Sequence, residues 1–234
     1  MNADFPLDPD AVAPLALSQA LLLPRIAIES VSPVLEAGEY AVKATVDQRI
    51  EVSSKVFTDG HDQLAVMLHW RLSGSDEWSA SSMAFTGNDT WQGAFWVPEP
   101  GRYVFCIEAW IDRYASFCHE LQKKYQAGIP VSLELQEGRI LVQRAIDSSH
   151  DELKEQLKTL LGQLVGLLET EQVALFMHEH SARLMAEAQH HAYVSFSHEF
   201  PVEVERPLAE FASWYELFPR SATDLSLIHI SEPT

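Results

Sequence analysis

The chain has 234 residues, of which 47% are hydrophobic and 21% are charged, proportions typical of a globular protein with its own core. Its net charge of −18 at pH 7 argues against binding to the phosphate backbone of nucleic acids or to an anionic membrane surface. The two cysteines, Cys106 and Cys118, form neither a disulfide framework nor a CxxC pair, which favours a reducing, cytoplasmic compartment.

Residues 1–23 are expected to form an N-terminal arm. The apolar run at 11–23 follows Asp4, Asp8 and Asp10 and no Lys or Arg, which is the wrong charge for an export signal. The run is also too short to span a bilayer. We therefore expect a flexible arm or a short helix that packs on the body, with no membrane contact.

Residues 24–112 are expected to form an immunoglobulin-like antiparallel β-sandwich. Runs rich in β-branched and aromatic residues, several of them alternating apolar with polar, predict strands at 25–31, 50–57, 63–70, 78–85, 90–97 and 102–110. Clusters of Gly, Pro, Asp and Asn separate these runs. Roughly seven short strands at this spacing, with no crossover helix between them, are typical of such a sandwich.

Residues 113–191 are expected to form an inserted helical subdomain. A helix is predicted at 114–126, closed by Gly128, and Ser149 with Glu152 has the spacing of a capping box. Two apolar stripes of helical period follow: Leu153, Leu157, Leu160, Leu161, Leu164 and Leu168, then Val173, Phe176, Met177, His180, Leu184 and Ala188. These stripes predict a helical hairpin or half of a bundle that needs a partner helix pair.

Alternation returns at 193–200 and 202–205, which predicts that late strands pair beside residues 102–110. The sandwich would then comprise residues 24–112 and 192–211, interrupted by the insertion at 113–191.

No catalytic, cofactor-binding or metal-ligating residue is assigned. His178 and His180 point about 200° apart on a helix, and Glu187 with His191 has ligand spacing but no third ligand. Neither Cys106 nor Cys118 has an electropositive neighbourhood, and both are interpreted as core residues. The sequence contains no glycine-rich phosphate loop and no GxSxG elbow.

The tryptophans leave a second function open. Trp78, Trp91 and Trp96 on a sheet surface could stack against the apolar faces of sugars. Trp91 and the pair Trp70 and Trp110 also fall where sandwiches keep core aromatics. The alternative function is therefore a stand-alone α-glucan-binding sandwich module.

Five stretches, in this order, resemble the N-terminal region of the α-1,4-glucan:maltose-1-phosphate maltosyltransferase family of the α-amylase clan. They are residues 25–33 (RIAIESVSP), 56–62 (VFTDGHD), 108–112 (EAWID), 121–128 (LQKKYQAG) and 213–221 (SWYELFPRS). The last of these resembles the first strand of a (β/α)8 barrel. The resemblance covers residues 24–221.

The resemblance implies an enzyme whose barrel transfers maltosyl from α-maltose 1-phosphate to the non-reducing end of an α-1,4-glucan, with release of phosphate and retention of configuration. It implies that the sandwich and its helical insertion are non-catalytic and belong to a homodimer interface. Residues 212–224 would begin the barrel, and its catalytic carboxyls would follow, so Glu216 is given no role. Residues 225–234 resemble a translated sequencing adapter, which predicts that the chain is a fragment.

A role in dimerisation is a third hypothesis and is compatible with the first. If the two helical stripes form the interface, Leu157→Glu together with Leu164→Glu should weaken self-association by placing charge in an apolar seam.

Overall fold

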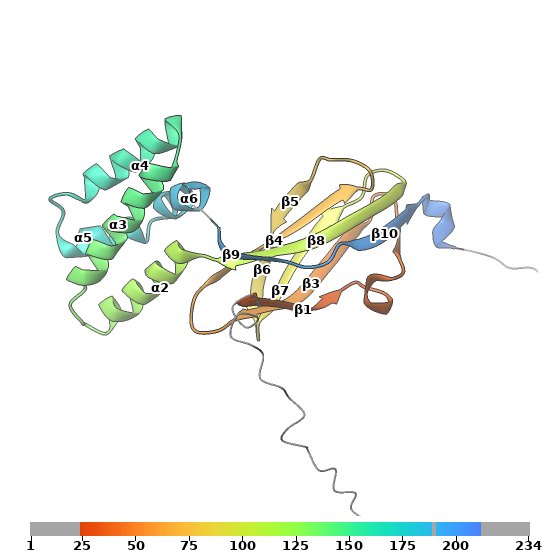
Figure 1. The fold of residues 1–234 in the computed structure, drawn as a ribbon, viewed down its shortest axis with the longest axis horizontal. Coiled ribbons are helices and arrows are strands. Elements are labelled where there is room, and N and C mark those ends of the chain that lie inside the picture. The colour runs from red at the N-terminus through yellow and green to blue at the C-terminus, as the bar shows by residue number, and fades with distance from the viewer. Residues whose placement is uncertain (1–23, 189–190, 212–234) are drawn as a thin grey trace, which may run out of the picture.

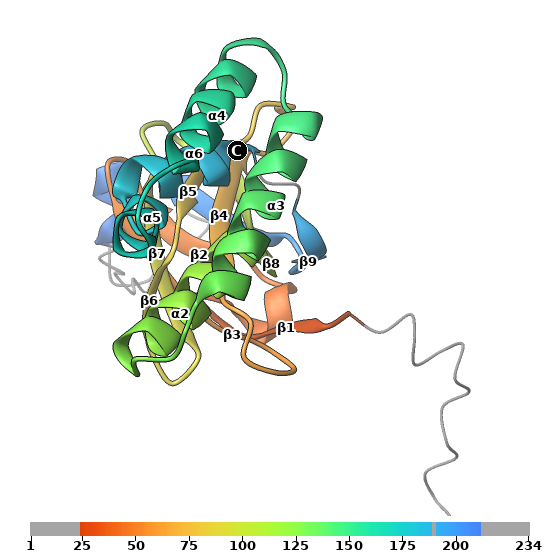
Figure 2. The same ribbon diagram turned by 90° about the vertical axis from the view of Figure 1, so that its left-hand side faces the viewer.

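The structure is a computed structural model that describes residues 24–188 and 191–211 (Figure 1). The predicted arm (1–23), the predicted start of a barrel (212–224) and the predicted adapter-derived tail (225–234) lie outside these residues. The described part combines a sandwich of two sheets with five helices gathered at one end of it (Figures 1 and 2). The mixed fold with a helical insertion is therefore confirmed.

Ten strands within the described residues form the two sheets. The four-stranded sheet has the order β1-β3-β7-β6, and the six-stranded sheet has the order β2-β10-β8-β4-β5 with β9 beside β8. The pairs are antiparallel except for β2 with β10, which is parallel. The strands are β1 Ile26–Ser32, β2 Val42–Thr45, β3 Arg49–Thr58, β4 Leu64–Leu72, β5 Ser79–Ser82, β6 Ala84–Gly87, β7 Thr90–Trp96, β8 Gly101–Ile111, β9 Ala192–Phe196 and β10 Phe200–Glu205.

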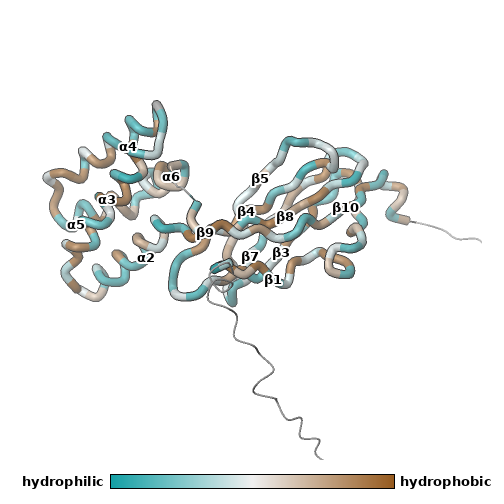
Figure 3. The backbone as a smooth tube through the Cα atoms, viewed as in Figure 1, coloured by the Kyte–Doolittle hydropathy of each residue, from teal (hydrophilic) through white to brown (hydrophobic). Residues whose placement is uncertain are grey.

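Alternation along the strands builds the core between the sheets. On β3, Ile50, Val52 and Val56 are buried, whereas Glu51 and Lys55 are exposed. Successive side chains of a strand point to opposite faces, so one face of β3 packs inward and the other meets water. Figure 3 shows the same alternation of hydrophobic and hydrophilic residues along the strands.

The predicted late strands are confirmed, and they pair with the predicted strand. Both β9 and β10 are antiparallel neighbours of β8, the strand predicted at 102–110. Ile111 at the end of β8 lies opposite Ala192 at the start of β9. The chain therefore leaves the sheet for the helices and returns to it at nearly the same point.

Two strand predictions are wrong in detail. The strand predicted at 78–85 is two strands, β5 and β6, which belong to different sheets. The buried Met83 lies between them, and its backbone N–H donates to the carbonyl oxygen of Val66 at 2.8 Å. The prediction also missed β2, a strand of four residues whose alternation is too short to distinguish from a loop.

The five helices bury their apolar faces against one another. They are α2 Arg113–Gln126, α3 Ser132–Ser148, α4 Asp151–Leu164, α5 Glu169–Phe176 and α6 Glu179–Ala188. Their apolar residues form one cluster separate from the core of the sandwich. The helix predicted at 114–126 and its end before Gly128 are confirmed. Among the described helices, none is long and apolar enough to cross a membrane.

The prediction that the leucine stripe needs a partner helix pair is wrong. Leu157, Leu160 and Leu164 are buried inside the helical cluster, with exposures of 0%, 3% and 1%. Leu168 lies beyond the end of α4 and is 70% exposed. The stripe is real, but helices of the same chain cover it, so these leucines are not available to a partner.

Two further helix predictions are corrected. The single helix expected to carry Val173 to Ala188 is α5 and α6, and His180 is exposed rather than part of the buried stripe. The capping box at Ser149 is also wrong. The Ser149 hydroxyl donates to the carbonyl oxygen of Ala145 at 2.7 Å, which ends α3, and the residue that precedes α4 is His150.

Candidate functional site at the junction of sheets and helices

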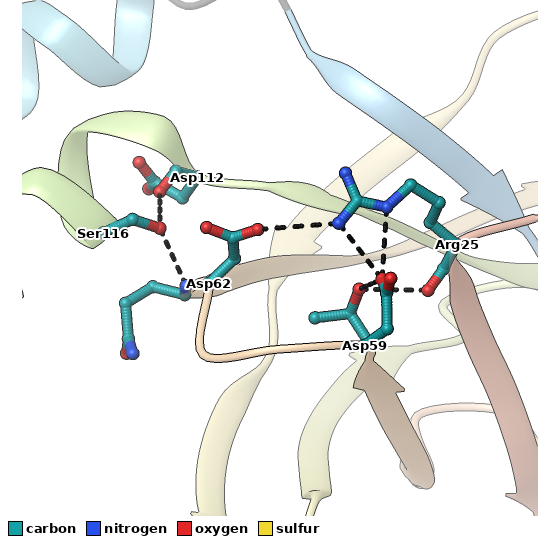
Figure 4. A network of polar contacts seen from close by, with 7 residues as sticks. Arg25, Asp59, Asp62, Asp112 and Ser116 are labelled. Atoms are coloured by element: carbon teal, nitrogen blue, oxygen red, sulfur yellow. Dashed lines mark hydrogen bonds and ion pairs between the residues drawn. The ribbon is translucent and has the colours of Figure 1, made fainter.

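The loop of residues 59–62 lies between β3 and β4, where the sandwich meets the helices. Gly60 has a φ of +92°, a backbone conformation that favours glycine because it lacks a Cβ atom. The Arg25 guanidinium, just before β1, lies 3.1 Å from a carboxylate oxygen of Asp59 and 3.9 Å from one of Asp62 (Figure 4). The Asp59 carboxylate raises the pKa of Arg25 above its ordinary value. The arginine therefore pairs with carboxylates on both sides of the turn.

Arg25 also links the loop to the strand that follows the helices. Its guanidinium carbon lies 4.5 Å from the centre of the Tyr193 ring on β9, which is within the range of a cation–π contact. The Thr58 hydroxyl donates to the Arg25 carbonyl oxygen at 3.0 Å. One side chain thus contacts the loop and the return strand.

Ser116 and Asp112 connect the same loop to the first helix. The backbone N–H of Gln63 donates to the Ser116 hydroxyl at 2.8 Å, and that hydroxyl donates to the Asp112 carbonyl oxygen at 2.7 Å (Figure 4). The Asp112 carboxylate accepts from the N–H of Ala115 at 2.8 Å, which satisfies a free donor at the start of α2. We call Arg25, Asp59, Asp62, Asp112 and Ser116 the junction site.

A cleft of about 680 Å³ opens beside the junction site. His61 and Asp62 line it from the loop, and α2 and α3 provide the other walls. A second cavity of about 350 Å³ shares His61, Asp62, His119 and Lys123 with the first. The remaining lining residues of the larger cleft are Ser116, Phe117, Glu120, Glu134, Glu137, Ile140, Leu141 and Arg144. The lining of this cleft is therefore a mixture of charged and apolar side chains.

Glu134 is the buried charge in this cleft. It is 6% exposed, and one carboxylate oxygen contacts the Lys124 ammonium at 2.5 Å while the other, Oε2, has no hydrogen-bond partner among the described residues. Lys124 also pairs with Glu120 on its own helix. The ammonium lowers the pKa of the Glu134 carboxyl, and Glu120 followed by Glu134 raises the pKa of Lys124. The pair joins α2 to α3.

Glu134 should contribute to the acid sensitivity of folding. Its pKa in the folded chain lies below the ordinary value of 4.5, so the unfolded chain binds a proton there more readily. The stabilisation is complete above about pH 4.5 and is lost as the pH falls through the lowered folded pKa. Urea unfolding between about pH 5 and pH 3 should therefore decline less steeply in Glu134→Gln than in the wild type. Glu137→Gln, which removes an exposed carboxyl of the same helix, is the control, and equal slopes in all three proteins would contradict the expectation.

A second polar cluster lies where the chain returns from the helices. The Glu108 carboxylate is 2.8 Å from Nε2 of His69 and 3.3 Å from Nδ1 of His191. The His191 ring stacks on Trp110, with centroids 3.8 Å apart. α6 ends at Ala188 and His191 is not helical, so the helical spacing expected between His191 and Glu187 does not apply.

The other residues weighed as metal ligands or nucleophiles do not converge. The N–H of His180 donates to Nδ1 of His178 at 3.1 Å, and in the described part of the chain no group of three potential ligands comes together. Cys106 is buried and Cys118 is half-buried. Burial raises the pKa of each thiol to about 11, so both are protonated at neutral pH, in agreement with their interpretation as packing residues.

The tryptophans do not form a common platform. Trp96 is 60% exposed on β7 of the four-stranded sheet, whereas Trp78 is 40% exposed just before β5 of the six-stranded sheet. Trp91 is half-buried against Phe85, and its indole N–H donates to the Val56 carbonyl oxygen at 3.3 Å. The interpretation of Trp91 as a packing residue is favoured over a role in sugar stacking.

Sequence reasoning found one part of the junction site and missed the other. The stretch 56–62 is one of those that resemble the family, and Asp112 is predicted as the last residue of the sandwich before the helical insertion. Arg25 and Ser116 were not singled out as partners of this loop. No local signal pairs Arg25 with Asp59, because the two lie 34 positions apart and meet only through the pairing of β1 with β3.

Comparison with known proteins identifies the family. Three relatives, each named alpha-1,4-glucan:maltose-1-phosphate maltosyltransferase, are similar to this chain. The Pseudomonas aeruginosa protein is 41% identical over 86% of this chain and 31% of its own length. The Burkholderia pseudomallei protein is 36% identical over 89% and 19%, and the Myxococcus xanthus protein is 35% identical over 86% and 32%. The chain therefore spans about a third or less of these relatives.

Among solved structures, a putative glycoside hydrolase from Bacteroides vulgatus matches 30% of this chain at 18% identity with a TM-score of 0.26, too low to relate the two folds. The family described as alpha-1,4-glucan:maltose-1-phosphate maltosyltransferase, domain N/S, matches residues 24–206. Because that match covers most of the sequence, this chain belongs to the alpha-1,4-glucan:maltose-1-phosphate maltosyltransferase family and contains its domain N/S.

Proposed function

We propose that this chain is the N-terminal, non-catalytic part of a maltosyltransferase. The observation that carries the proposal is the family match over residues 24–206, in relatives of which the matched region is a third or less. The whole protein would transfer maltosyl from α-maltose 1-phosphate to the non-reducing end of an α-1,4-glucan and release phosphate. Retention of configuration requires a carboxylate nucleophile and a second carboxyl that acts as acid and then base. We propose that both carboxyl groups belong to the part of the enzyme that lies beyond this chain. A stand-alone glucan-binding module is not favoured.

A phosphate-release assay tests whether catalysis requires the part of the enzyme beyond this chain. A protein that continues through the full length of the relatives should release phosphate from α-maltose 1-phosphate when a maltooligosaccharide acceptor is present. Residues 1–211 alone should release none above the rate without protein. Acceptor-dependent release by pure residues 1–211 would contradict the proposal.

The domain division predicted from the sequence is kept as part of the proposal. An immunoglobulin-like sandwich would comprise residues 24–112 and 192–211, and an inserted helical subdomain would comprise residues 113–191. Two separate apolar clusters, one between the sheets and one among the helices, support it. A cytoplasmic location is supported by two thiols that form no disulfide with each other.

We further propose a homodimer formed by the helical insertion with the sandwich. The leucine stripe of α4 is buried within the chain, so a different surface must serve. Leu133 and Ile140 lie seven residues apart on α3, hence on one face of it, and are 62% and 45% exposed. Ile129, just before α3, is 51% exposed. Ile140 also lines the large cleft, so the apolar face continues into a concave surface.

Leu133→Glu together with Ile140→Glu should raise the dissociation constant of the dimer about 100-fold or more, because each change places a charge in an apolar interface. Both side chains are exposed in the monomer, so the helices should stay folded. Sedimentation equilibrium over a concentration series measures the change. Leu168→Glu, which alters a 70% exposed leucine on a different part of the helical region, is the control and should leave the dimer intact. A molar mass that is the same for wild type and double variant at every concentration would remove this surface from consideration.

A further inference from the structure

A polar groove crosses the outer face of the four-stranded sheet. It has a volume of about 580 Å³ and is lined by residues of β1, β3, β5 and β7. On β3, Arg49, Glu51 and Ser53 alternate with buried residues, so their side chains point away from the core. Residues directly opposite one another in a sheet share a face, and the strand register places three more small or polar side chains beside them. We call the six residues Ser32, Arg49, Glu51, Ser53, Gln92 and Ala94 the sheet groove.

The sheet groove is electrically neutral and rich in hydrogen-bonding groups. Its two charged residues, Arg49 and Glu51, form an ion pair in which Nη1 lies 2.5 Å from a carboxylate oxygen. That contact leaves further guanidinium donors and a second carboxylate oxygen available. The Ser53 hydroxyl and the Gln92 amide form no hydrogen bond with other described residues. In a chain with a net charge of −18, a neutral groove of this kind suits an uncharged polar ligand better than a cation or a phosphate.

Trp96 adds a large apolar surface at one end of the sheet groove. It lies directly opposite Arg49, on the same face of the sheet, and it is the exposed tryptophan of β7. Within the described residues, no other ring and no cation stacks on its indole. The ring of a pyranose sugar has an apolar face that stacks on aromatic side chains, and hydroxyl groups surround that face. An exposed indole beside neutral hydrogen-bonding groups therefore matches the chemistry of a sugar.

We propose that the sheet groove together with Trp96 binds an α-1,4-glucan chain at a site that takes no part in the transfer reaction. The inference rests on the proposed function, because that function supplies the class of sugar. The indole stacks on one glucose unit, while Arg49, Glu51 and Gln92 exchange hydrogen bonds with hydroxyls of the neighbouring units. The groove volume lies within the range of about 300–1,000 Å³ that is usual for ligand sites. Such a site is part of the enzyme and raises the local concentration of a polymeric acceptor.

Titration of this chain with maltoheptaose tests the proposal. The indole N–H signals of the tryptophans are followed by nuclear magnetic resonance, and each is assigned by its absence from the corresponding Trp→Phe variant. The signal of Trp96 should shift progressively as maltoheptaose is added. The signal of Trp70, whose half-buried ring stacks on Phe95, should stay in place. A Trp96 signal that does not move up to the solubility limit of the sugar would overturn the proposal.

Calorimetric titration of two matched variants locates the bound sugar. Trp96→Ala should raise the dissociation constant for maltoheptaose about tenfold or more, because it removes the stacking surface. The side chain is exposed, so the variant should stay folded, which circular dichroism checks. Trp78→Ala, which removes an exposed tryptophan beside the other sheet, should leave the dissociation constant unchanged. Equal dissociation constants for wild type and Trp96→Ala, or a loss of binding in Trp78→Ala alone, would contradict the proposal.

This test is independent of the phosphate-release assay, because binding is measured in the absence of maltose 1-phosphate. If the full-length protein releases phosphate but maltoheptaose does not move the Trp96 signal, the proposed function stands and the glucan site is wrong. If the Trp96 signal moves but the full-length protein releases no phosphate, the glucan site stands and the proposed function is wrong.

Discussion

Leu157→Ala is expected to lower the free energy of unfolding by about 2–5 kcal/mol, the range for emptying a fully buried leucine site. Leu157 is 0% exposed on α4 and packs in the cluster that all five helices share. Removal of its isobutyl group leaves a cavity that rigid helix packing fills only in part. Urea unfolding followed by circular dichroism measures the loss.

Leu133→Ala is the matched control for this change. It makes the same substitution on a neighbouring helix of the same cluster, but at a side chain that is 62% exposed, so stability should change by no more than about 0.5 kcal/mol in the monomer. A loss below about 1 kcal/mol for Leu157→Ala would show that the helical cluster is loosely packed. Leu157→Glu with Leu164→Glu would unfold the helices, so that pair cannot test self-association as the sequence suggested.

Gly138→Ala is expected to destabilise the chain, although alanine is the better helix former. A Cβ atom at Gly138 on α3 would lie 2.5 Å from the Phe117 ring and 2.7 Å from the Phe176 ring. Both rings are nearly or fully buried, so neither can move without disturbing the cluster. Overpacking of this kind costs about 1–3 kcal/mol, which exceeds the gain of up to about 1 kcal/mol in helix propensity.

Gly162→Ala is the opposite case and serves as the control. Gly162 lies within α4, is exposed, and a Cβ atom there would meet nothing within 4 Å. Only the helix propensity changes, so this variant should be more stable by about 0.5–1 kcal/mol. Thermal unfolding of both variants should show midpoints that move in opposite directions. A rise in both midpoints would mean that the contact of α3 with the two rings is not tight.

The sheet strands were predictable wherever one face is buried and the run is long. β3 and β8 show this, because their alternation extends over ten and eleven residues. The split of residues 78–85 was not predictable, since the chain changes sheets at Met83 through tertiary packing rather than through a glycine or proline. Likewise, Ser149 had the spacing of a capping box, but its hydroxyl found a nearer acceptor in the preceding helix.

The helical stripes show what hydrophobic periodicity cannot predict. Leu157 and Leu164 were correctly placed on one helical face, but periodicity does not tell which surface covers that face. The structure shows that helices of the same chain do so. The contacts of the junction site were likewise not predictable from the local sequence. Residues 56–62 stood out in the sequence, yet their partner Arg25 is brought there only by the pairing of β1 with β3.

The parallel pairing of β2 with β10 has a consequence for synthesis of the protein. Val42 pairs with Val202, roughly 160 positions later. At a translation rate of about 5–20 residues per second, β2 waits about 8–30 s for its partner to be made. The helices, whose contacts are mostly local, can form within that interval. The sandwich thus stays incomplete on the ribosome until the insertion has been translated, and during that time the edge of β2 that later pairs with β10 is open to pairing with other chains.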